Sequence, residues 1–215
     1  ASTQIKPQVT YNTTANQYLV VWDDERNGAG NQDIFAQRVD ANGNLVGVNF
    51  GVVTAAASQA TPDVVYNSTA NEYLVICEDF RNGNTDIFGQ RVDAAGNLVG
   101  GNISLVVGPG QQRWPTVAYN SATNQYLLTY SNDAGDGEIF ALRVDAAGNL
   151  APGRRGAFQG KVTRRCPRLP VSRAAGFAVV HEVRCAGRRN RPSTNSTHPP
   201  RTQTVRLAAG RLTEC

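Results

Sequence analysis

Acidic side chains are the first candidates for chemistry in this chain of 215 residues. A pair of carboxylates such as Asp23 and Glu78 could act as the general acid and the base or nucleophile of a glycosidase. Spacing alone does not distinguish this pair from the other acids. The two histidines, His181 and His198, are too few and too isolated to indicate a metal site. A Gly-x-Ser-x-Gly elbow, a phosphate-binding loop and a Cys-x-x-Cys pair are all missing, so catalysis has little support.

Two acidic loops suggest calcium binding. They are "WDDERNGAGNQD", residues 22–33, and "NDAGDGE", residues 132–138. Carboxylate and carbonyl oxygens are the ligands that calcium prefers, but neither loop has the spacing of an EF-hand. Turn chemistry explains the Asp, Asn and Gly of these loops equally well. We therefore predict no resident cofactor and retain calcium as the one metal that these loops could bind.

The elements that must position these acids belong to an internal repeat. The string "DIFAQRVDANGNLVG" at 33–47 returns as "DIFGQRVDAAGNLVG" at 86–100 and as "EIFALRVDAAGNL" at 138–150. Such self-similarity at a fixed period indicates that one structural unit is used several times.

Prolines mark where each copy begins. Pro7, Pro62 and Pro115 open three copies and are separated by 55 and 53 residues. Pro167 lies another 52 residues on and opens a diverged fourth copy, in which "VRLAAGRL" at 205–212 matches the repeated string. The chain therefore contains four units of about 53 residues.

Each copy shows four strand signals, and no window of ten or more residues has a helical period. This pattern predicts an all-β fold, a β-propeller of four four-stranded blades with a shortened closing strand. The expected blades are residues 7–61, 62–114, 115–166 and 167–215, with residues 1–6 helping to close a single domain. A solenoid ranks second, and an open array or part of a larger propeller are further alternatives.

A family resemblance supports the propeller. The pattern is carried in the second copy by Pro62, Asp79, Arg81, Asn82, Gly83, Asp86, Ile87, Phe88, Asp93 and Gly96. It resembles the TolB-type relatives of WD-repeat propellers and the repeats of large secreted bacterial proteins, over the first three copies. The resemblance implies the fold and a secreted, extracellular protein. It implies no activity, because propellers serve in binding, scaffolding and catalysis alike.

One position differs in chemistry between the copies. It is occupied by Trp22, Cys77, Tyr130 and His181. Because the place is the same in each blade, the four side chains could form one surface around the axis. The alternative is that each side chain packs between two neighbouring blades. On the first interpretation, Trp22, Tyr130 and His181 are candidate ligand-binding residues.

One arginine is kept in every copy, as Arg38, Arg91 and Arg143 show. A residue that all copies keep is expected to hold each blade together. We expect its guanidinium to form a bidentate pair with an acid of a neighbouring loop, Asp24 or Asp79.

The cysteines bear on the compartment. Cys166 lies just before the first strand of the fourth copy and Cys185 lies just after its second strand. These two points are neighbours in an antiparallel hairpin, so we expect a disulfide between them and an oxidising environment. Cys77 is expected to be buried, and Cys215 to be free or intermolecular.

Charge is divided along the chain. Residues 1–150 carry seven Lys or Arg and fifteen Asp or Glu, whereas the remainder carries fourteen and two. This asymmetry suggests a site for an acidic polysaccharide, with Arg188, Arg189 and Arg191 as contacts, or self-association of acidic blades with the basic fourth blade. The alternative is that arginine codons accumulated by simple drift, so that the basic charge has no binding role. Nucleic acid fits poorly because stacking aromatics are missing near these arginines, and no apolar run is long enough for a membrane span.

Together these features favour a secreted, non-enzymatic, lectin-like propeller that binds a carbohydrate or another extracellular partner. The alternative is a propeller hydrolase or lyase of polysaccharides whose carboxylates converge on the axis. A structural module of a larger surface protein is a third interpretation.

Overall fold

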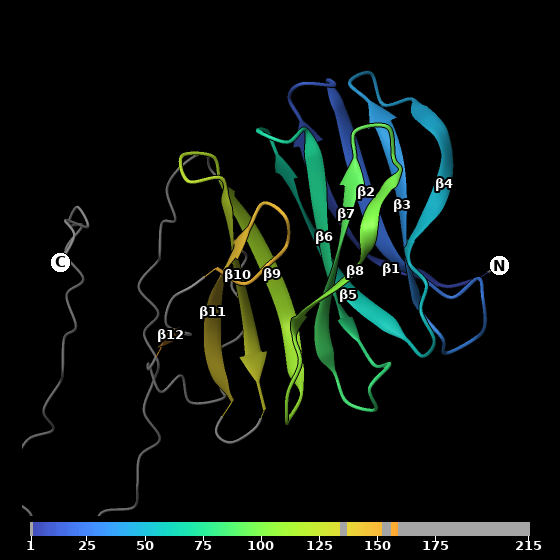
Figure 1. The fold of residues 1–215 in the computed structure, drawn as a ribbon. Coiled ribbons are helices and arrows are strands. Elements are labelled where there is room, and N and C mark those ends of the chain that lie inside the picture. Colours follow the sequence, from blue (N-terminus) through green and yellow to red (C-terminus); the bar gives the residue numbers. More distant parts are fainter. Residues whose placement is uncertain (1, 134–136, 152–155, 159–215) are drawn as a thin grey trace, which may run out of the picture. The chain divides into compact units, whose positions relative to one another are not determined.

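Twelve β-strands and no helix make up the part of the chain that the computed structural model describes, residues 2–133, 137–151 and 156–158 (Figure 1). The strands form three antiparallel sheets of four strands each, here called blades 1, 2 and 3. In every sheet the strands are neighbours in chain order. Each blade is therefore a simple meander.

The strand boundaries repeat closely from blade to blade. Blade 1 contains β1 (Gln4–Asn12), β2 (Gln17–Asp24), β3 (Asp33–Asp40) and β4 (Leu45–Val53). Blade 2 contains β5 (Gln59–Asn67), β6 (Glu72–Asp79), β7 (Asp86–Asp93) and β8 (Leu98–Val106). Blade 3 contains β9 (Gln112–Asn120), β10 (Gln125–Asn132), β11 (Glu138–Asp145) and the short β12 (Gly156–Phe158).

The turn between the first two strands explains the repeated asparagines. In blade 1 the Asn12 side-chain oxygen accepts the N–H groups of Thr14 and Ala15, at 2.9 and 2.8 Å. Asn16 then adopts φ of 51°, a left-handed conformation that asparagine tolerates better than most residues. Blade 2 repeats the arrangement from Asn67. The asparagines thus close the hairpin that precedes each second strand.

The repeated Asp-x-x-Gly-Asn string forms the turn after the third strand. The Asp40 carboxylate accepts the N–H groups of Asn42 and Asn44, both at 2.8 Å, and Gly43 has φ of 88°. This network lowers the pKa of Asp40, chiefly because the Asn44 side chain donates to the carboxylate. The string therefore recurs because each blade needs the same turn.

The first strands lie at the inner edge of the blades. β1 packs against β5, and β5 packs against β9; Figure 1 shows the blades following one another from blue to yellow. Apolar side chains fill the space between consecutive blades. Leu19 and Val21 of blade 1 meet Val64 and Tyr73 of blade 2 in one core, and a second core joins blades 2 and 3. Packing between blades thus provides the hydrophobic stabilisation.

Tyrosines reinforce this packing with hydrogen bonds. The Tyr66 hydroxyl donates to Thr14 Oγ1 of the preceding blade at 2.7 Å, and Tyr119 does the same to Thr69. Buried tyrosines normally find such a partner for their polar end. The equivalent Tyr11 of blade 1 donates within its own blade and is 39% exposed. The face of blade 1 that corresponds to a buried face of blade 2 is therefore open.

The all-β prediction is confirmed for three four-stranded antiparallel blades. Residues 167–215 lie outside the described residues, so the fourth blade and the four-blade ring stay predictions. The described part also shows that each blade reaches back before its expected proline: β5 begins at Gln59, ahead of Pro62.

Candidate functional site

Each inner strand bends at the residue that precedes its proline. Lys6, Thr61 and Trp114 have φ of 53°, 55° and 52°, a conformation that residues other than glycine rarely adopt. Pairing with the second strand shifts register across the same place in all three blades. Bulges of this kind redirect side chains and occur near functional sites.

Carboxylates of the preceding blade hold these bulges in place. Asp23 Oδ1 accepts the N–H of Thr61 at 2.9 Å, and a Glu78 oxygen accepts the N–H of Trp114 at 2.7 Å. The two acids occupy equivalent places in β2 and β6, because Asp23 is paired with Ile34 and Glu78 with Ile87. The pair that sequence analysis named is therefore built into the contact between consecutive blades.

Asp23 is fully buried and its Oδ2 lies 3.0 Å from Lys6 Nζ. Burial raises the pKa of Asp23 above its ordinary value because the charged form loses hydration, whereas Lys6 and the N–H of Thr61 act in the opposite direction. Lys6 Nζ also donates to Thr61 Oγ1 at 3.2 Å. Asp23 is thus a buried carboxyl group that contacts a half-exposed ammonium group.

Glu78 has a similar environment and is 4% exposed. Burial raises the pKa of Glu78, and the N–H of Trp114 and the positive charges of Arg113 and Lys6 oppose that rise. The negative charge of Asp23 raises the pKa of Glu78 further. Asp23 and Glu78 are therefore two buried carboxyl groups with raised pKa values, and raised pKa values are a feature of carboxyl groups that act in acid–base catalysis.

These groups together form one site at the bulge end of the blades. We call it the bulge cluster, and it consists of Lys6, Asp23, Thr61, Glu78, Arg113 and Trp114. Arg113 Nε lies 3.7 Å from the carboxylate of Asp133, and Trp114 is 56% exposed. Sequence analysis had named only the two acids of this cluster. For Lys6, Thr61 and Trp114 the signal was the residue before each repeat proline, which changes from Lys to Thr to Trp between copies.

The sequence-predicted ligand residues lie elsewhere. The Trp22 indole N–H donates to Asp24 at 2.9 Å, and the buried Tyr130 ring stacks on Phe140 with centroids 5.4 Å apart. Cys77, at the same place in blade 2, is a buried free thiol whose pKa burial raises well above its ordinary value. Ligand binding by Trp22 and Tyr130 stays a prediction. His181, Arg188, Arg189, Arg191 and the Cys166–Cys185 pair, with Cys215, lie outside the described residues.

Two of the repeated arginines, Arg38 and Arg91, do not pair as expected. Arg91 donates to Glu72 of its own blade at 2.9 Å and not to Asp79. Asp79 is instead held by Arg81, two residues away, at 2.6 Å. Arg38 donates to the carbonyl oxygen of Ala94 in the next blade. The prediction of a pair with Asp24 or Asp79 was wrong because a nearer arginine already occupies those acids.

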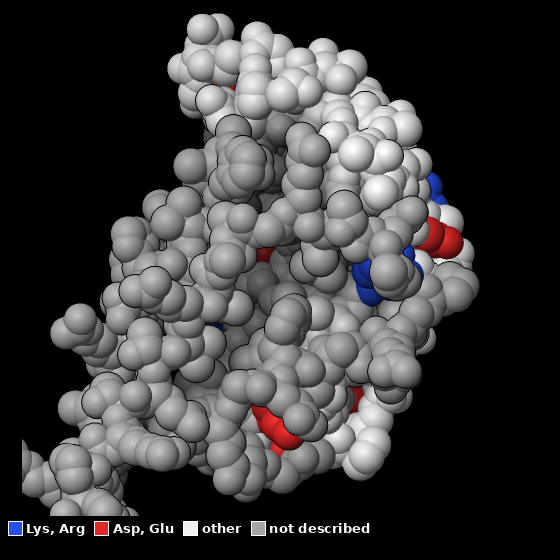
Figure 2. Space-filling view, turned by 90° about the vertical axis from the view of Figure 1, so that its left-hand side faces the viewer, with Lys and Arg blue, Asp and Glu red and all other residues white. Residues whose placement is uncertain are grey.

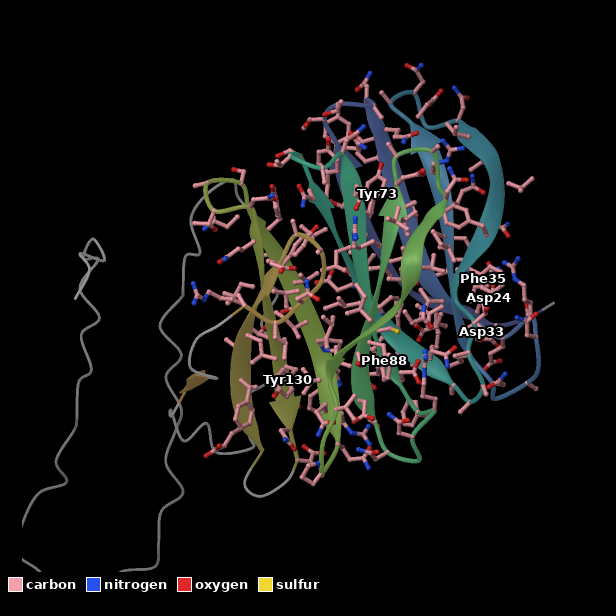
Figure 3. All side chains as sticks on the ribbon, in the orientation of Figure 1. Asp24, Asp33, Phe35, Tyr73, Phe88 and Tyr130 are labelled. Carbon is pink, nitrogen blue, oxygen red and sulfur yellow. The ribbon has the colours of Figure 1, made fainter. Side chains whose placement is uncertain are left out.

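The nearer arginine forms a repeated structural group. Arg26 pairs with Asp24 at 2.6 Å and its guanidinium lies 3.9 Å from the centre of the Phe35 ring. Figure 3 shows Asp24, Asp33 and Phe35 together in blade 1. The bond from Arg26 holds the pKa of Asp24 well below its usual range. Asn27 donates to Asp33 at 2.6 Å. This loop is therefore closed by its own side chains.

Calcium binding stays a prediction for these loops. Within the described ranges, no group of three or more His, Cys, Asp or Glu is placed to hold a metal ion. No helix of the described part is long and apolar enough to cross a membrane. On the face seen in Figure 2, both Lys or Arg and Asp or Glu side chains of the described residues reach the surface.

Comparisons with known proteins show the fold. No family model and no curated protein sequence matches the chain. An N-acetylgalactosamine deacetylase from F. plautii matches with a TM-score of 0.52 and 8% identity over 69% of this chain and 51% of its own. The endo-arabinase from Bacteroides thetaiotaomicron matches with a TM-score of 0.51 and 12% identity over 72% and 61%. A thermostable family-43 glycoside hydrolase matches with a TM-score of 0.52 and 10% identity over 76% and 62%.

At these identities the likeness shows a β-propeller-like fold, and the chain spans between about half and three-fifths of those structures. The comparison also corrects the leading sequence-based hypothesis. That hypothesis was a non-enzymatic binding module, with an enzyme held to be the weaker interpretation. The similar structures are a deacetylase, an endo-arabinase and a glycoside hydrolase, which counts against that hypothesis.

Proposed function

We propose that this protein is a propeller-type glycoside hydrolase that cleaves a polysaccharide, with Asp23 and Glu78 as its paired carboxylates. The single observation that carries the proposal is that two buried acids with raised pKa values occupy equivalent places in β2 and β6, each bonded to the bulge of the next blade. The similarity to enzymes that act on carbohydrates supports the same function.

The environments of the two acids suggest distinct roles. Within the described part of the chain Glu78 forms no ion pair, and only the more distant charges of Arg113 and Lys6 favour its ionised form, so we assign it the general acid that protonates the leaving oxygen. Asp23 contacts the Lys6 ammonium at 3.0 Å, which favours the charged form, so we assign it the base or nucleophile.

Amide variants test the proposal because they preserve the structural bond. Asp23→Asn and Glu78→Gln each keep an oxygen that can accept the N–H of the next blade. Reducing-sugar release should be measured for the full chain on arabinan, xylan and galactan. We expect wild-type turnover on one of them and a fall of at least about a hundredfold in either variant.

A scaffolding role for the acids gives a different result. Each carboxylate does join two blades, so a purely structural pair would leave turnover unchanged in the amide variants and lower only their stability. Val107→Thr is a matched control, since Val107 is 53% exposed and lies outside the bulge cluster. Wild-type protein that cleaves none of the three polysaccharides would contradict the proposal.

We also propose an extracellular location, which a polysaccharide substrate would suit. The TolB-like resemblance and the expected Cys166–Cys185 disulfide are consistent with it. Thiol titration of unfolded protein under non-reducing conditions tests this: two free thiols support the disulfide, and four contradict it.

A further inference from the structure

We infer that Trp114 is a stacking platform for a sugar ring of the polysaccharide, an inference that rests on the proposed function. Among the aromatic side chains that the structure describes, Trp114 has the largest exposed fraction, at 56%. An exposed indole offers a broad apolar plane on which another ring can pack.

The repeat supplies an internal control for this residue. Trp114 occupies the place that Lys6 has in blade 1 and Thr61 in blade 2, and all three share nearly the same backbone conformation. The blade therefore folds equally with a cation, a small hydroxyl or an indole at this position. Since folding does not require tryptophan there, its presence in blade 3 needs a reason outside the blade.

The backbone also fixes where the indole begins. Trp114 has φ of 52°, and its N–H is held at 2.7 Å by Glu78. A non-glycine residue in this conformation is strained and persists where neighbouring groups impose it. The Trp114 side chain therefore starts from the Cα atom next to the backbone nitrogen that donates to Glu78, the proposed general acid. A sugar lying on the ring would be adjacent to that acid.

The chemistry of the surroundings suits a neutral polysaccharide. A sugar ring has an apolar C–H face that packs on an aromatic plane and an edge of hydroxyl groups that need polar partners. Lys6 and Arg113 lie in the same cluster and can donate to hydroxyls, while their charges are already balanced by Asp23 and Asp133. We therefore assign the platform to an uncharged sugar of a neutral chain such as arabinan, xylan or galactan.

Trp114→Thr is the test because threonine is the natural residue at this bulge in blade 2. Affinity for soluble arabinan, xylan and galactan is measured for the full chain in the Glu78→Gln background, which blocks turnover and leaves the indole in place. We expect Trp114→Thr to weaken binding about tenfold and Trp114→Phe about threefold or less. Val107→Thr, which removes an equally exposed apolar side chain elsewhere, should leave binding unchanged.

Fluorescence gives a second readout, since the chain has only two tryptophans. The bound polysaccharide should protect wild-type emission from acrylamide, and this protection should vanish in Trp114→Thr. Unchanged affinity and protection in the variant, in a protein that cleaves the polysaccharide, would overturn the inference and leave the proposed function standing. Tenfold weaker binding with no turnover in wild type would instead support the platform and overturn the hydrolase. Wild-type protein that binds none of the three overturns both.

Discussion

The Asp63 carboxylate on β5 accepts a hydrogen bond from the backbone N–H of Val117 on β9, at 2.9 Å. Its other oxygen accepts the N–H of Val64 in its own strand, also at 2.9 Å. Asp63 is 3% exposed, so both bonds lie away from water. One side chain thus joins the first strands of two consecutive blades.

Replacing this carboxylate should destabilise the contact between blades 2 and 3. Asp63→Ala leaves the buried N–H of Val117 without an acceptor, so we expect a loss of about 1–3 kcal/mol in the free energy of unfolding. Asp63→Asn keeps one acceptor oxygen and should lose less. Urea denaturation of the full chain measures both variants, and equal stability of Asp63→Ala and wild type would contradict the assignment.

Alanine variants at two equivalent glycines distinguish the cost of backbone strain from the cost of a steric contact between blades. Gly43 and Gly96 have φ of 88° and 91° in equivalent turns. A Cβ at Gly43 would meet nothing within 4 Å, whereas one at Gly96 would lie 3.1 Å from Arg38 Nε and 3.2 Å from the Phe50 ring. Both alanine variants should lose about 1–2 kcal/mol from left-handed strain. We expect Gly96→Ala to lose about 1 kcal/mol more, and equal losses would disprove the contact.

Two adjacent leucines on β10 point to opposite faces of blade 3 and differ in exposure, so their variants test which face is buried. Leu128 is 0% exposed and packs toward blade 2, whereas Leu127 is 44% exposed. Leu128→Ala should cost about 2–5 kcal/mol by chemical denaturation, and Leu127→Ala less than about 1 kcal/mol. A cost for Leu127→Ala as large as that for Leu128→Ala would show that a further blade covers this face.

Acid should weaken blade 1 through Asp24. Its pKa is lowered in the folded protein, chiefly by the bond from Arg26, relative to the ordinary value of 3.8. The ionised form is therefore favoured by folding, and its stabilising contribution is complete above pH 3.8 and is lost as pH falls toward the folded pKa. Asp24→Asn should flatten the stability profile below pH 3.8. Thermal melting across this range measures the slope, and an unchanged slope would exclude Asp24 as its source.

Turnover should have a pH optimum displaced upward from that of ordinary carboxylates. The pKa values of Asp23 and Glu78 are both raised by burial. The base must be ionised and the acid protonated, so activity should rise through the first pKa and fall through the second. Lys6→Gln removes the charge that opposes the rise at Asp23 and should shift the acidic limb to higher pH. An unshifted limb would show that Asp23 is not the base.

Local turn chemistry was readable from the sequence, because the groups involved lie within five residues of one another. Asn12 and Asp40 close their turns with neighbouring N–H groups, and the strings that contain them predicted the blade. The bulges were not readable, because the acid that holds Thr61 lies 38 residues away on another blade. The same limit explains the arginines: only the folded loop shows that Arg81 already occupies Asp79.

The candidate site was likewise only partly predictable from the sequence. The sequence shows that Asp23 and Glu78 are acidic, as are many other residues. Only the structure shows the burial and the nearby charge of Lys6 that distinguish these two acids as candidates. Trp22 and Tyr130 attracted attention because their position varied between copies. That variation reflects different neighbours within and between blades, since Tyr130 stacks on Phe140 while Cys77 is enclosed in the first core.

The bulge has a consequence for how such a protein can change over generations. A carboxylate of the preceding blade holds the backbone at Thr61 and at Trp114. The blade can therefore fold with different side chains at this position. Each duplication of a blade therefore creates one more place where mutation alters what the surface recognises and leaves the scaffold intact. Lysine, threonine and tryptophan at successive copies are what divergence after duplication would leave behind.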